Sequence, residues 1–202
     1  MGWIETYPKG MINEGSTTQG VNGSTGTYYT GGILVNLDGK RFINECAWDD
    51  EVRNAGLKAQ PESYMFEIFT DKILEDTQGT LRGAYDSFKE GGIYRSRLVE
   101  ADSLAEKLQI PADALVKTVE DYNAAVEAGV PDEFGREFEV KPNENRVEAV
   151  NKIEGDHYYA LKLQPIVLSS RGGICVNENN QVVTDEGTVI PGLYAGGEVV
   201  GQ

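Results

Sequence analysis

The amino-acid sequence predicts an α+β fold, and three observations lead to that class. Segments with strand character and segments with helix character follow each other irregularly, without the repeating strand–helix–strand units that build a parallel sheet. One long amphipathic helix is expected at residues 111–129, between segments rich in strand-forming residues. Hydrophobic residues make up 40% of the 202 residues and charged residues 25%, which is enough apolar material for a core of ordinary size.

The stretch 11–32 is rich in Gly, Ser, Thr and Asn. This composition is typical of a floppy loop, but also of a binding loop that its neighbours hold in place. The adjacent aromatic residues Tyr28 and Tyr29, and the strand character directly after them, favour the ordered loop.

A β-hairpin is expected at residues 33–45, because two apolar runs flank the strong turn signal Asp38-Gly39. Three further elements follow in order: a short helix at 48–60 with acidic residues in its first turn, a strand at 63–71, and a helix at 80–92 closed by glycine.

The helix at 111–129 has the clearest local signals in the chain. Pro111 starts it and Gly129 ends it, and a shorter helix that Asp102 caps precedes it. Its apolar stripe is formed by Leu115, Val119, Tyr122 and Val126. The polar and charged segment 130–156 predicts a loop or a weak helix.

The chain then resumes as strand at 158–168 and forms a second hairpin at 172–184 around Asn179-Asn180. A last strand runs into Gly196-Gly197-Glu198. Glycines after a strand let another group come close to the backbone, so this end of the strand is a candidate binding site.

The formal net charge of −15 argues against a nucleic-acid partner, because phosphate binding needs clustered Lys and Arg. The longest apolar runs are only a few residues, so no membrane span is expected. The first residues carry no targeting signal, and the compartment stays open. With Cys46 and Cys175 far apart and only His157 as a histidine, no metal site is expected. Two free thiols are favoured, with a disulfide as the alternative.

Three stretches together resemble one family: residues 31–45 (GGILVNLDGKRFINE), residues 111–129 (PADALVKTVEDYNAAVEAG) and residues 172–198 (GGICVNENNQVVTDEGTVIPGLYAGGE), with "YYALKLQP" between the last two. They are similar to the flavoprotein fumarate reductases, which include the flavoprotein subunit of succinate dehydrogenase, flavocytochrome c and ketosteroid dehydrogenase relatives. The resemblance covers nearly the whole chain.

The resemblance implies that residues 1–168 form the capping domain that closes over flavin and substrate. Residues 169–202 then return into the Rossmann-type FAD-binding domain. It implies FAD as the cofactor, and it carries cofactor-binding roles over to Gly172, Gly173, Gly196, Gly197 and Glu198. The G-x-G-x-x-G fingerprint of such domains is absent. We therefore expect a truncated piece of a longer flavoprotein, which does not hold FAD without the remainder of the flavin domain and is inactive by itself.

The ionic catalysts of the resembled family are replaced at every position that can be matched. The arginine that protonates the substrate falls on Asp49, and the two substrate-binding histidines fall on Tyr7 and Leu168. A Thr-Glu pair and a second arginine match Ser24, Thr25 and Tyr28. Fumarate itself is therefore not the expected substrate.

Neutral hydroxyl groups stand at or beside these positions. We assign Tyr7, Tyr28 and Tyr29 as candidate catalytic residues, because tyrosine polarises carbonyls and donates protons. The alternative is that these tyrosines pack beside a strand. A neutral pocket suits an enone or a ketone better than a dicarboxylate.

Ser169, Ser170 and Arg171 are the candidate substrate-binding residues, and a surface salt bridge is the alternative for Arg171. His157, beside charged residues, is expected to be exposed.

The function that follows is part of an FAD-dependent oxidoreductase acting on an activated C=C or CH–CH bond of a small molecule. The alternative is a non-catalytic small-molecule binding module that retains the cap fold. The "GLYAGGE" segment argues against that alternative, because a module without flavin has no need for its glycine pattern.

Overall fold

A computed structural model describes residues 3–11, 21–22, 27–47, 50–76, 98–100, 104–138, 150–171 and 173–200. For residues 3–11, 21–22, 50–51, 98–100 and 165–171 it describes the backbone alone. The helix predicted at 80–92 and the predicted cap Asp102 lie outside the described residues.

The chain divides into two compact units. The central unit comprises Pro8–Ile166, and the terminal unit comprises Met1–Tyr7 together with Val167–Gln202. The chain passes between the units in two strands, which are the first and the longest of the described strands.

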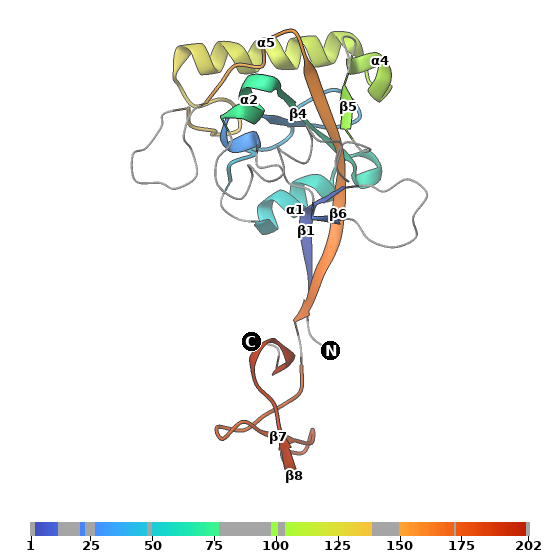
Figure 1. Cartoon of the computed structure of the whole chain (residues 1–202), viewed down its shortest axis with the longest axis vertical. Helices are drawn as coiled ribbons and strands as arrows, with labels where there is room; N and C mark the ends of the chain where they lie inside the picture. Colours follow the sequence, from blue (N-terminus) through green and yellow to red (C-terminus); the bar gives the residue numbers. More distant parts are fainter. Residues whose placement is uncertain are drawn as a thin grey trace. The chain divides into compact units, whose positions relative to one another are not determined.

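The described elements follow one another as shown in Figure 1. In chain order they are β1 (Trp3–Met11), β2 (Val21–Asn22), η1 (Thr27–Tyr29), β3 (Ile33–Val35), α1 (Asp50–Lys58), η2 (Pro61–Ser63), β4 (Met65–Thr70), α2 (Asp71–Glu75), β5 (Leu98–Glu100), α4 (Leu104–Leu108), α5 (Ala112–Ala128), β6 (Tyr158–Arg171), β7 (Gln181–Val183), β8 (Val189–Tyr194) and η4 (Gly197–Val200).

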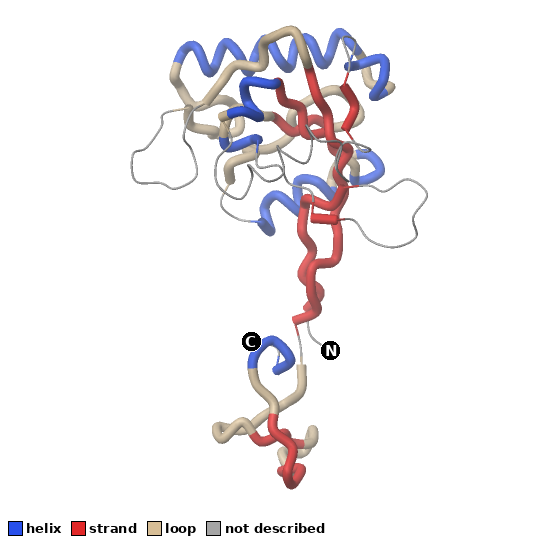
Figure 2. The backbone as a smooth tube through the Cα atoms, in the orientation of Figure 1, coloured by secondary structure: helices blue, strands red, loops and turns tan. Residues whose placement is uncertain are grey.

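A six-stranded sheet organises the central unit, with the strand order β2-β1-β6-β4-β3 and β5 also paired to β6 (Figure 2). Strand β4 pairs with β6 from Met65↔Leu163 to Thr70↔Tyr158, and β3 pairs with β4 through Ile33↔Ile68. The pairs β1–β2, β3–β4, β4–β6, β5–β6 and β7–β8 are all antiparallel. Helices mixed with such a sheet confirm the predicted α+β class.

The core of the central unit surrounds β4, whose six residues are all buried. In Figure 1 this strand lies between α5 on one side and α1 on the other. Helix α5 buries Leu115 and Tyr122, with Val119 and Val126 partly buried beside them, so the predicted stripe is confirmed. Gly129 ends the helix in a left-handed conformation (φ 63°) that glycine adopts without strain, as predicted.

The first predicted hairpin is only half formed. Its turn is present, since the Asn36 N–H donates to the Lys40 carbonyl (2.9 Å), but the second strand is reduced to the single bridge Val35↔Arg41. The Leu34 N–H is bonded by the side chain of Glu45 (Oε1, 3.1 Å) instead of a backbone carbonyl. The prediction of a full second strand at 40–45 is therefore wrong, because Glu45 turns inward and replaces the ladder.

The second predicted hairpin is confirmed in the terminal unit. Val176 bridges Val182 across a turn in which the Asn180 N–H donates to the Asn177 carbonyl (2.9 Å). Strand β7 then pairs with β8 in an antiparallel two-stranded sheet.

Candidate functional site

The segment 27–32, named the tyrosine turn from here on, carries two of the three candidate catalytic tyrosines. It begins with η1 and closes on itself, because the N–H groups of Thr30 (3.0 Å) and Gly32 (2.8 Å) both donate to the Thr27 carbonyl. The ring centroids of Tyr28 and Tyr29 lie 4.4 Å apart. Tyr28 is 2% exposed and Tyr29 is half-buried, so Tyr29 is the more exposed of the two residues.

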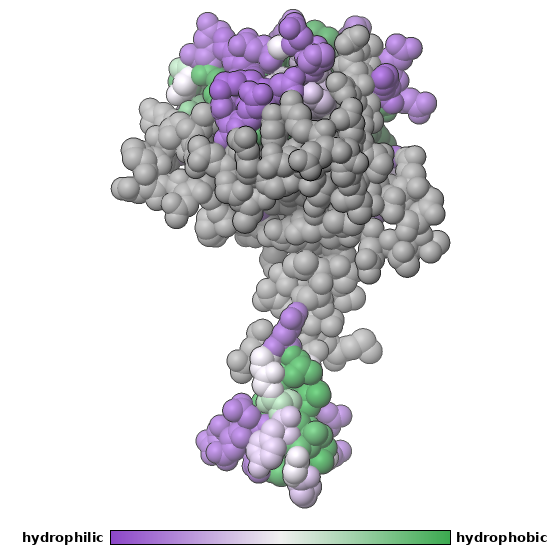
Figure 3. Space-filling model, viewed as in Figure 1, coloured by the Kyte–Doolittle hydropathy of each residue, from purple (hydrophilic) through white to green (hydrophobic). Residues whose placement is uncertain are grey.

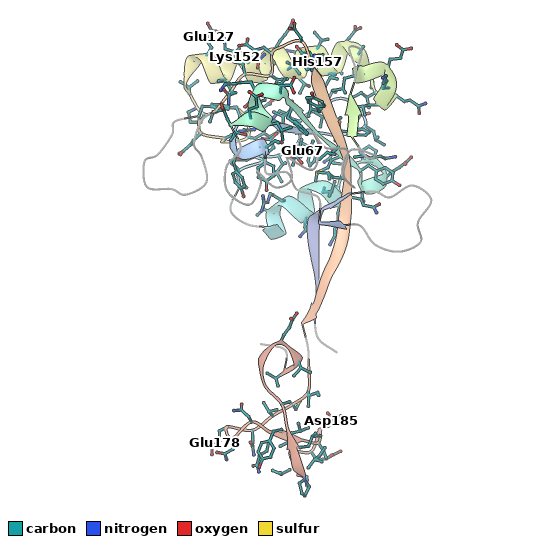
Figure 4. The ribbon with its side chains drawn as sticks, viewed as in Figure 1. Glu67, Glu127, Lys152, His157, Glu178 and Asp185 are labelled. Atoms are coloured by element: carbon teal, nitrogen blue, oxygen red, sulfur yellow. The ribbon has the colours of Figure 1, made fainter. Side chains whose placement is uncertain are left out.

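Side chains from distant parts of the central unit anchor this turn. The Thr27 hydroxyl donates to Glu67 Oε1 of β4 (2.6 Å), and the Thr30 hydroxyl donates to the Ile73 carbonyl of α2 (2.8 Å). Asn151 donates to the Thr30 carbonyl through its backbone N–H (3.0 Å) and its Nδ2 (2.9 Å). In Figure 4 Glu67 lies in the interior, whereas Glu127 and Lys152 lie on the outer face. These contacts hold residues 27–32 in place, as expected of an ordered loop, whereas residues 12–20 and 23–26 of the predicted loop lie outside the described residues.

Behind the tyrosine turn lies a set of charged side chains, named the buried ion cluster: Arg41, Glu45, Asp132 and Arg136. The carboxylate of Glu45, which is 0% exposed, accepts hydrogen bonds from Arg41 Nε (2.7 Å), Arg41 Nη2 (2.7 Å) and Arg136 Nη1 (2.9 Å). Arg41 Nη1 also forms an ion pair with Asp132 Oδ2 (2.6 Å). The charges of the cluster balance, as buried ions require.

Arg136 joins the cluster to the tyrosine turn. Its guanidinium donates to the carbonyls of Tyr28 (Nη2, 2.7 Å) and Gly32 (Nη1, 2.9 Å). It also lies over the Tyr122 ring, 5.1 Å from the centroid. Burial by itself lowers the pKa of Arg136, but Tyr122, Glu45 and Cys46 more than offset this effect, so its pKa is raised and it stays a cation.

The sequence around Arg136 explains how a loop delivers a buried arginine. Asp132 Oδ1 accepts the N–H groups of Phe134 and Arg136 (2.9 Å each), and the Gly135 N–H donates to the Asp132 carbonyl (2.9 Å). Gly135 has a φ of 73°, which glycine adopts readily. The short loop therefore has its own hydrogen bonds and aims Arg136 at the core.

Two further side chains border the tyrosine turn. The guanidinium of Arg53, on α1, lies 5.9 Å from the Tyr28 ring centroid, and its Nη1 is 3.5 Å from the Glu45 carbonyl. The Cys46 thiol donates to the Tyr28 carbonyl (3.4 Å), and burial raises the pKa of that thiol. Cys46 and Cys175 are both free, which confirms the prediction of two free thiols.

A cavity of about 500 Å³ opens on the other side of the cluster, between α5 and the loop at 132–134. Its lining consists of Lys40, Arg41, Ala114, Lys117, Thr118, Asp121, Tyr122, Ala125, Asp132, Glu133 and Phe134. Three cationic and three anionic side chains line it, so the cavity has no net preference for either sign. It contains none of the predicted site residues.

The other predicted substrate residues lie in the terminal unit. Tyr7 is on β1, and Ser169, Ser170 and Arg171 are on β6, where the backbone alone is described. Tyr28 and Tyr29 belong to the central unit. The predicted catalytic set is therefore divided between the two units, and its roles stay predictions.

Most of the predicted cofactor residues are exposed in the terminal unit. Gly173, Gly196, Gly197 and Glu198 are exposed, and Gly172 lies outside the described residues. A Cβ added at Gly196 or Gly197 would meet no atom within 4 Å, so the backbone there is open to a close approach. Glu198 adds an exposed carboxylate that accepts hydrogen bonds from hydroxyl groups. An open glycine backbone beside a hydrogen-bond acceptor is chemically compatible with the hydroxyl-bearing ribityl chain of a flavin, and the cofactor role of these residues stays a prediction.

Large apolar side chains of the terminal unit face solvent. They are Ile174, Val189, Ile190, Leu193, Tyr194 and Val199. Figure 3 shows hydrophobic residues gathered on this unit, whereas hydrophilic residues cover α5. An apolar surface of this kind is typical of an interaction site.

Sequence reasoning missed the buried ion cluster. Arg136 stands in a charged segment that predicts a solvated loop, and Glu45 stands where a strand was expected. The Asp132-x-x-Gly135-Arg136 pattern was the one local signal, because it is typical of a side-chain-stabilised turn. His157 is exposed, as predicted.

Neither a metal site nor a membrane span is found in the part of the chain that the structure describes. Within it, no three His, Cys, Asp or Glu side chains gather in a group that would hold a metal ion. Among the same residues, no helix has the length and apolar character to cross a membrane.

Comparisons with known proteins point to one group of enzymes. The family of FAD binding domains matches residues 6–202. Fumarate reductase (cytochrome) of Shewanella frigidimarina is 33% identical over 100% of this chain and 31% of its own length. 3-Oxosteroid 1-dehydrogenase of Mycobacterium tuberculosis is 31% identical over 84% of this chain and 33% of its own length.

A solved structure gives the same result. The open conformation of a flavocytochrome c3 fumarate reductase aligns with a TM-score of 0.74 and 25% identity, over 98% of this chain and 31% of that chain. The chain spans about a third or less of the length of the curated relatives that it matches.

Proposed function

The chain belongs to the FAD binding domain family, among the fumarate reductase-like flavoproteins, and on that premise we propose that it covers the substrate in a longer FAD-dependent oxidoreductase. The reaction would add hydrogen to, or remove it from, an activated carbon–carbon bond of a small molecule. The observation that carries this proposal is the family match from residue 6 to residue 202. In this proposal residues 1–168 are the capping domain and residues 169–202 the return into the flavin domain.

The substrate class follows from the side chains that stand in place of ionic catalysts. Tyr7 and the tyrosine turn offer neutral hydroxyl groups, and Asp49 stands where the resembled enzymes carry a cation. A neutral pocket does not compensate the two charges of fumarate, so we propose a ketone or an enone. The similarity to a 3-oxosteroid 1-dehydrogenase supports a carbonyl-bearing substrate, because an oxosteroid is a ketone.

When bound, FAD supplies hydride exchange with a substrate carbon. The protein would orient the carbonyl compound, exclude water, and donate a hydrogen bond from a tyrosine phenol to the carbonyl oxygen, where negative charge develops. Tyr7 and Tyr29 are the proposed donors, and the burial of Tyr28 favours a packing role for that ring. Ser169, Ser170 and Arg171 would contact the rest of the substrate.

The terminal unit would complete the cofactor site together with further chain. Gly196, Gly197 and Glu198 would hold FAD, with Gly172 and Gly173 beside it. The exposed apolar side chains of this unit would pack against the remainder of the flavin domain, which would remove them from water. We therefore expect this chain to bind no FAD by itself, and the purified chain to be colourless.

The test uses the flavoprotein that carries this chain. Its flavin is reduced with dithionite and mixed in a stopped-flow instrument with 2-cyclohexen-1-one or with fumarate. We expect fast reoxidation by the enone and little reoxidation by fumarate. Tyr7→Phe or Tyr29→Phe should slow the enone reaction on the order of 10²-fold without a change in flavin content, because one oxyanion donor is lost.

Tyr64→Phe is the matched control. Its half-buried ring lies 4.5 Å from Lys162 Nζ in the central unit and has no proposed role, so the rate should not change. Fumarate reoxidation as fast as that by the enone would contradict the neutral-pocket proposal. An enone that perturbs the flavin spectrum without reoxidising it would instead favour the non-catalytic binding module.

A further inference from the structure

The Arg136 guanidinium donates hydrogen bonds to the backbone of the tyrosine turn. We propose that Arg136 is a positioning residue, which fixes the place of the Tyr29 phenol for the reaction. This inference rests on the proposed function of the tyrosine turn and adds a residue from a distant loop. Arg136 is 0% exposed, and 104 and 108 residues separate it from the Gly32 and Tyr28 carbonyls to which it donates.

The acceptors of its hydrogen bonds indicate that Arg136 positions the backbone and does not only balance the charge of Glu45. One planar guanidinium contacts the Tyr28 carbonyl, the Gly32 carbonyl and the Glu45 carboxylate at 2.7–2.9 Å. Tyr28 directly precedes Tyr29 in the chain, and Gly32 follows it by three residues, so the two carbonyls lie on either side of Tyr29. A rigid fork of donors fixes the distance between its acceptors, which a point charge such as lysine does not do.

A contribution to the stability of the fold does not by itself explain why an arginine is buried at this position. Burying an ion pair costs desolvation that its own attraction barely repays, and apolar replacements are often at least as stable. Other contacts already anchor the turn, since Thr27 is bonded to Glu67 and Thr30 to Ile73. What Arg136 adds is control of the backbone on both sides of Tyr29.

Arg41 provides a matched comparison within the same cluster. It donates to the same carboxylate of Glu45 and lies over the same ring, 5.4 Å from the Tyr122 centroid. Its other ionic partner is Asp132, and the hydrogen bonds described for its side chain do not go to the tyrosine turn. A purely structural role of the cluster predicts equal effects of changing either arginine, whereas positioning predicts different effects.

The experiment compares Arg136→Lys with Arg41→Lys, because both changes keep the positive charge. Amide hydrogen exchange of this chain, read at the N–H groups of Thr30 and Gly32, reports the order of the turn. The N–H of Gly129, which donates to Ala125 and Val126 of α5, is the internal reference. We expect Arg136→Lys to speed exchange at Thr30 and Gly32 on the order of tenfold, and Arg41→Lys to leave it near the parent rate.

The same two variants are then measured in the flavoprotein that carries this chain. Arg136→Lys should lower kcat for 2-cyclohexen-1-one about 10- to 100-fold, with KM and flavin content near the parent values, because a small displacement of a catalytic donor affects the chemical step. Arg41→Lys should keep kcat within about threefold of the parent. If Arg136→Lys does not fold, Arg136→Gln is compared with Arg41→Gln in both measurements, because each of these changes removes one positive charge beside Glu45 and retains a planar donor group.

Two results would overturn the inference. Equal effects of Arg136→Lys and Arg41→Lys on exchange and on kcat would mean that the cluster only stabilises the fold. An unchanged kcat in Arg136→Lys, with Tyr29→Phe impaired, would mean that the turn keeps its active geometry without Arg136. If Tyr29→Phe leaves kcat unchanged, it is the proposed function of the tyrosine turn that fails, and this outcome is distinguishable from the other two.

Discussion

The central unit and the terminal unit differ in which side chains they bury and which they expose. The central unit buries the carboxylate of Glu45 and the guanidinium of Arg136 completely and pairs them with each other. The terminal unit leaves large apolar side chains such as Leu193 and Tyr194 exposed, at 46% and 62%. Among the described residues of the central unit, the Glu45 carboxylate is bonded by two arginines of the same unit. The exposed apolar side chains of the terminal unit are of a kind that is typical of interaction sites.

The two units therefore differ in what stabilises them. The central unit has a closed hydrophobic core and an internal ion cluster, so its stability depends on its own residues. The exposed face of the terminal unit gains stability only when something covers it. Mutations of matched residues in the two units should therefore have very different effects, and each pair tests the comparison.

The largest effect is expected from Glu45→Gln. This change leaves the cations of Arg41 and Arg136 buried with one carboxylate fewer, which should cost about 3–5 kcal/mol of the free energy of unfolding. Urea unfolding followed by circular dichroism at 222 nm measures it, because the described α-helices all lie in the central unit. Glu178→Gln, in the terminal unit, should leave the curve unchanged (Figure 4). Equal curves for the two variants would refute the ion cluster as a structural requirement.

A pair of leucines gives the next largest effect. Leu161 is 0% exposed on β6, opposite Glu67 and Leu98, whereas Leu193 lies exposed on β8. Leu161→Ala should destabilise the central unit by about 2–5 kcal/mol through lost burial and a new cavity. Leu193→Ala should cost less than about 0.5 kcal/mol in the same experiment. A large cost for Leu193→Ala would show that the apolar face of the terminal unit is already covered.

The comparison with the smallest expected effect needs no mutation and uses the two thiols of the chain. Burial raises the pKa of Cys46, whereas Cys175 is exposed, so iodoacetamide at pH 8 should modify Cys175 on the order of tenfold faster or more. Mass spectrometry of peptides sampled over time measures both rates. In concentrated urea the two rates should converge, and equal rates in the folded chain would place Cys46 at the surface.

Much of the local structure could be predicted from neighbouring residues. Pro111 and Gly129 marked the ends of α5 to within a residue, and the Asp38-Gly39 and Asn179-Asn180 turns form where their residue types favour them. Such signals work because capping and turn conformations depend on side chains only a few residues away. The helix predicted at 80–92 lies outside the described residues and stays a prediction.

The candidate site was less accessible to sequence reasoning. The tyrosines were found because of their residue type, but neither the burial of Tyr28 nor the support from Arg136 follows from their neighbours in the chain. A charged residue in a polar segment predicts solvent exposure, which is the common outcome. Arg136 departs from it because a carboxylate and two carbonyls, all distant in the sequence, converge on its side chain.

By itself, the sequence determined the α+β class, the helix α5, the long strand β6 and the family to which the chain belongs. Periodicity, turn residues and short motifs specify these properties locally. Only the tertiary structure decided that Glu45 turns inward and ends the first hairpin, and that Arg136 supports the tyrosine turn. The physical reason is that the free energy of a buried charge depends on partners brought together from distant parts of the chain. No local pattern of residues encodes that convergence.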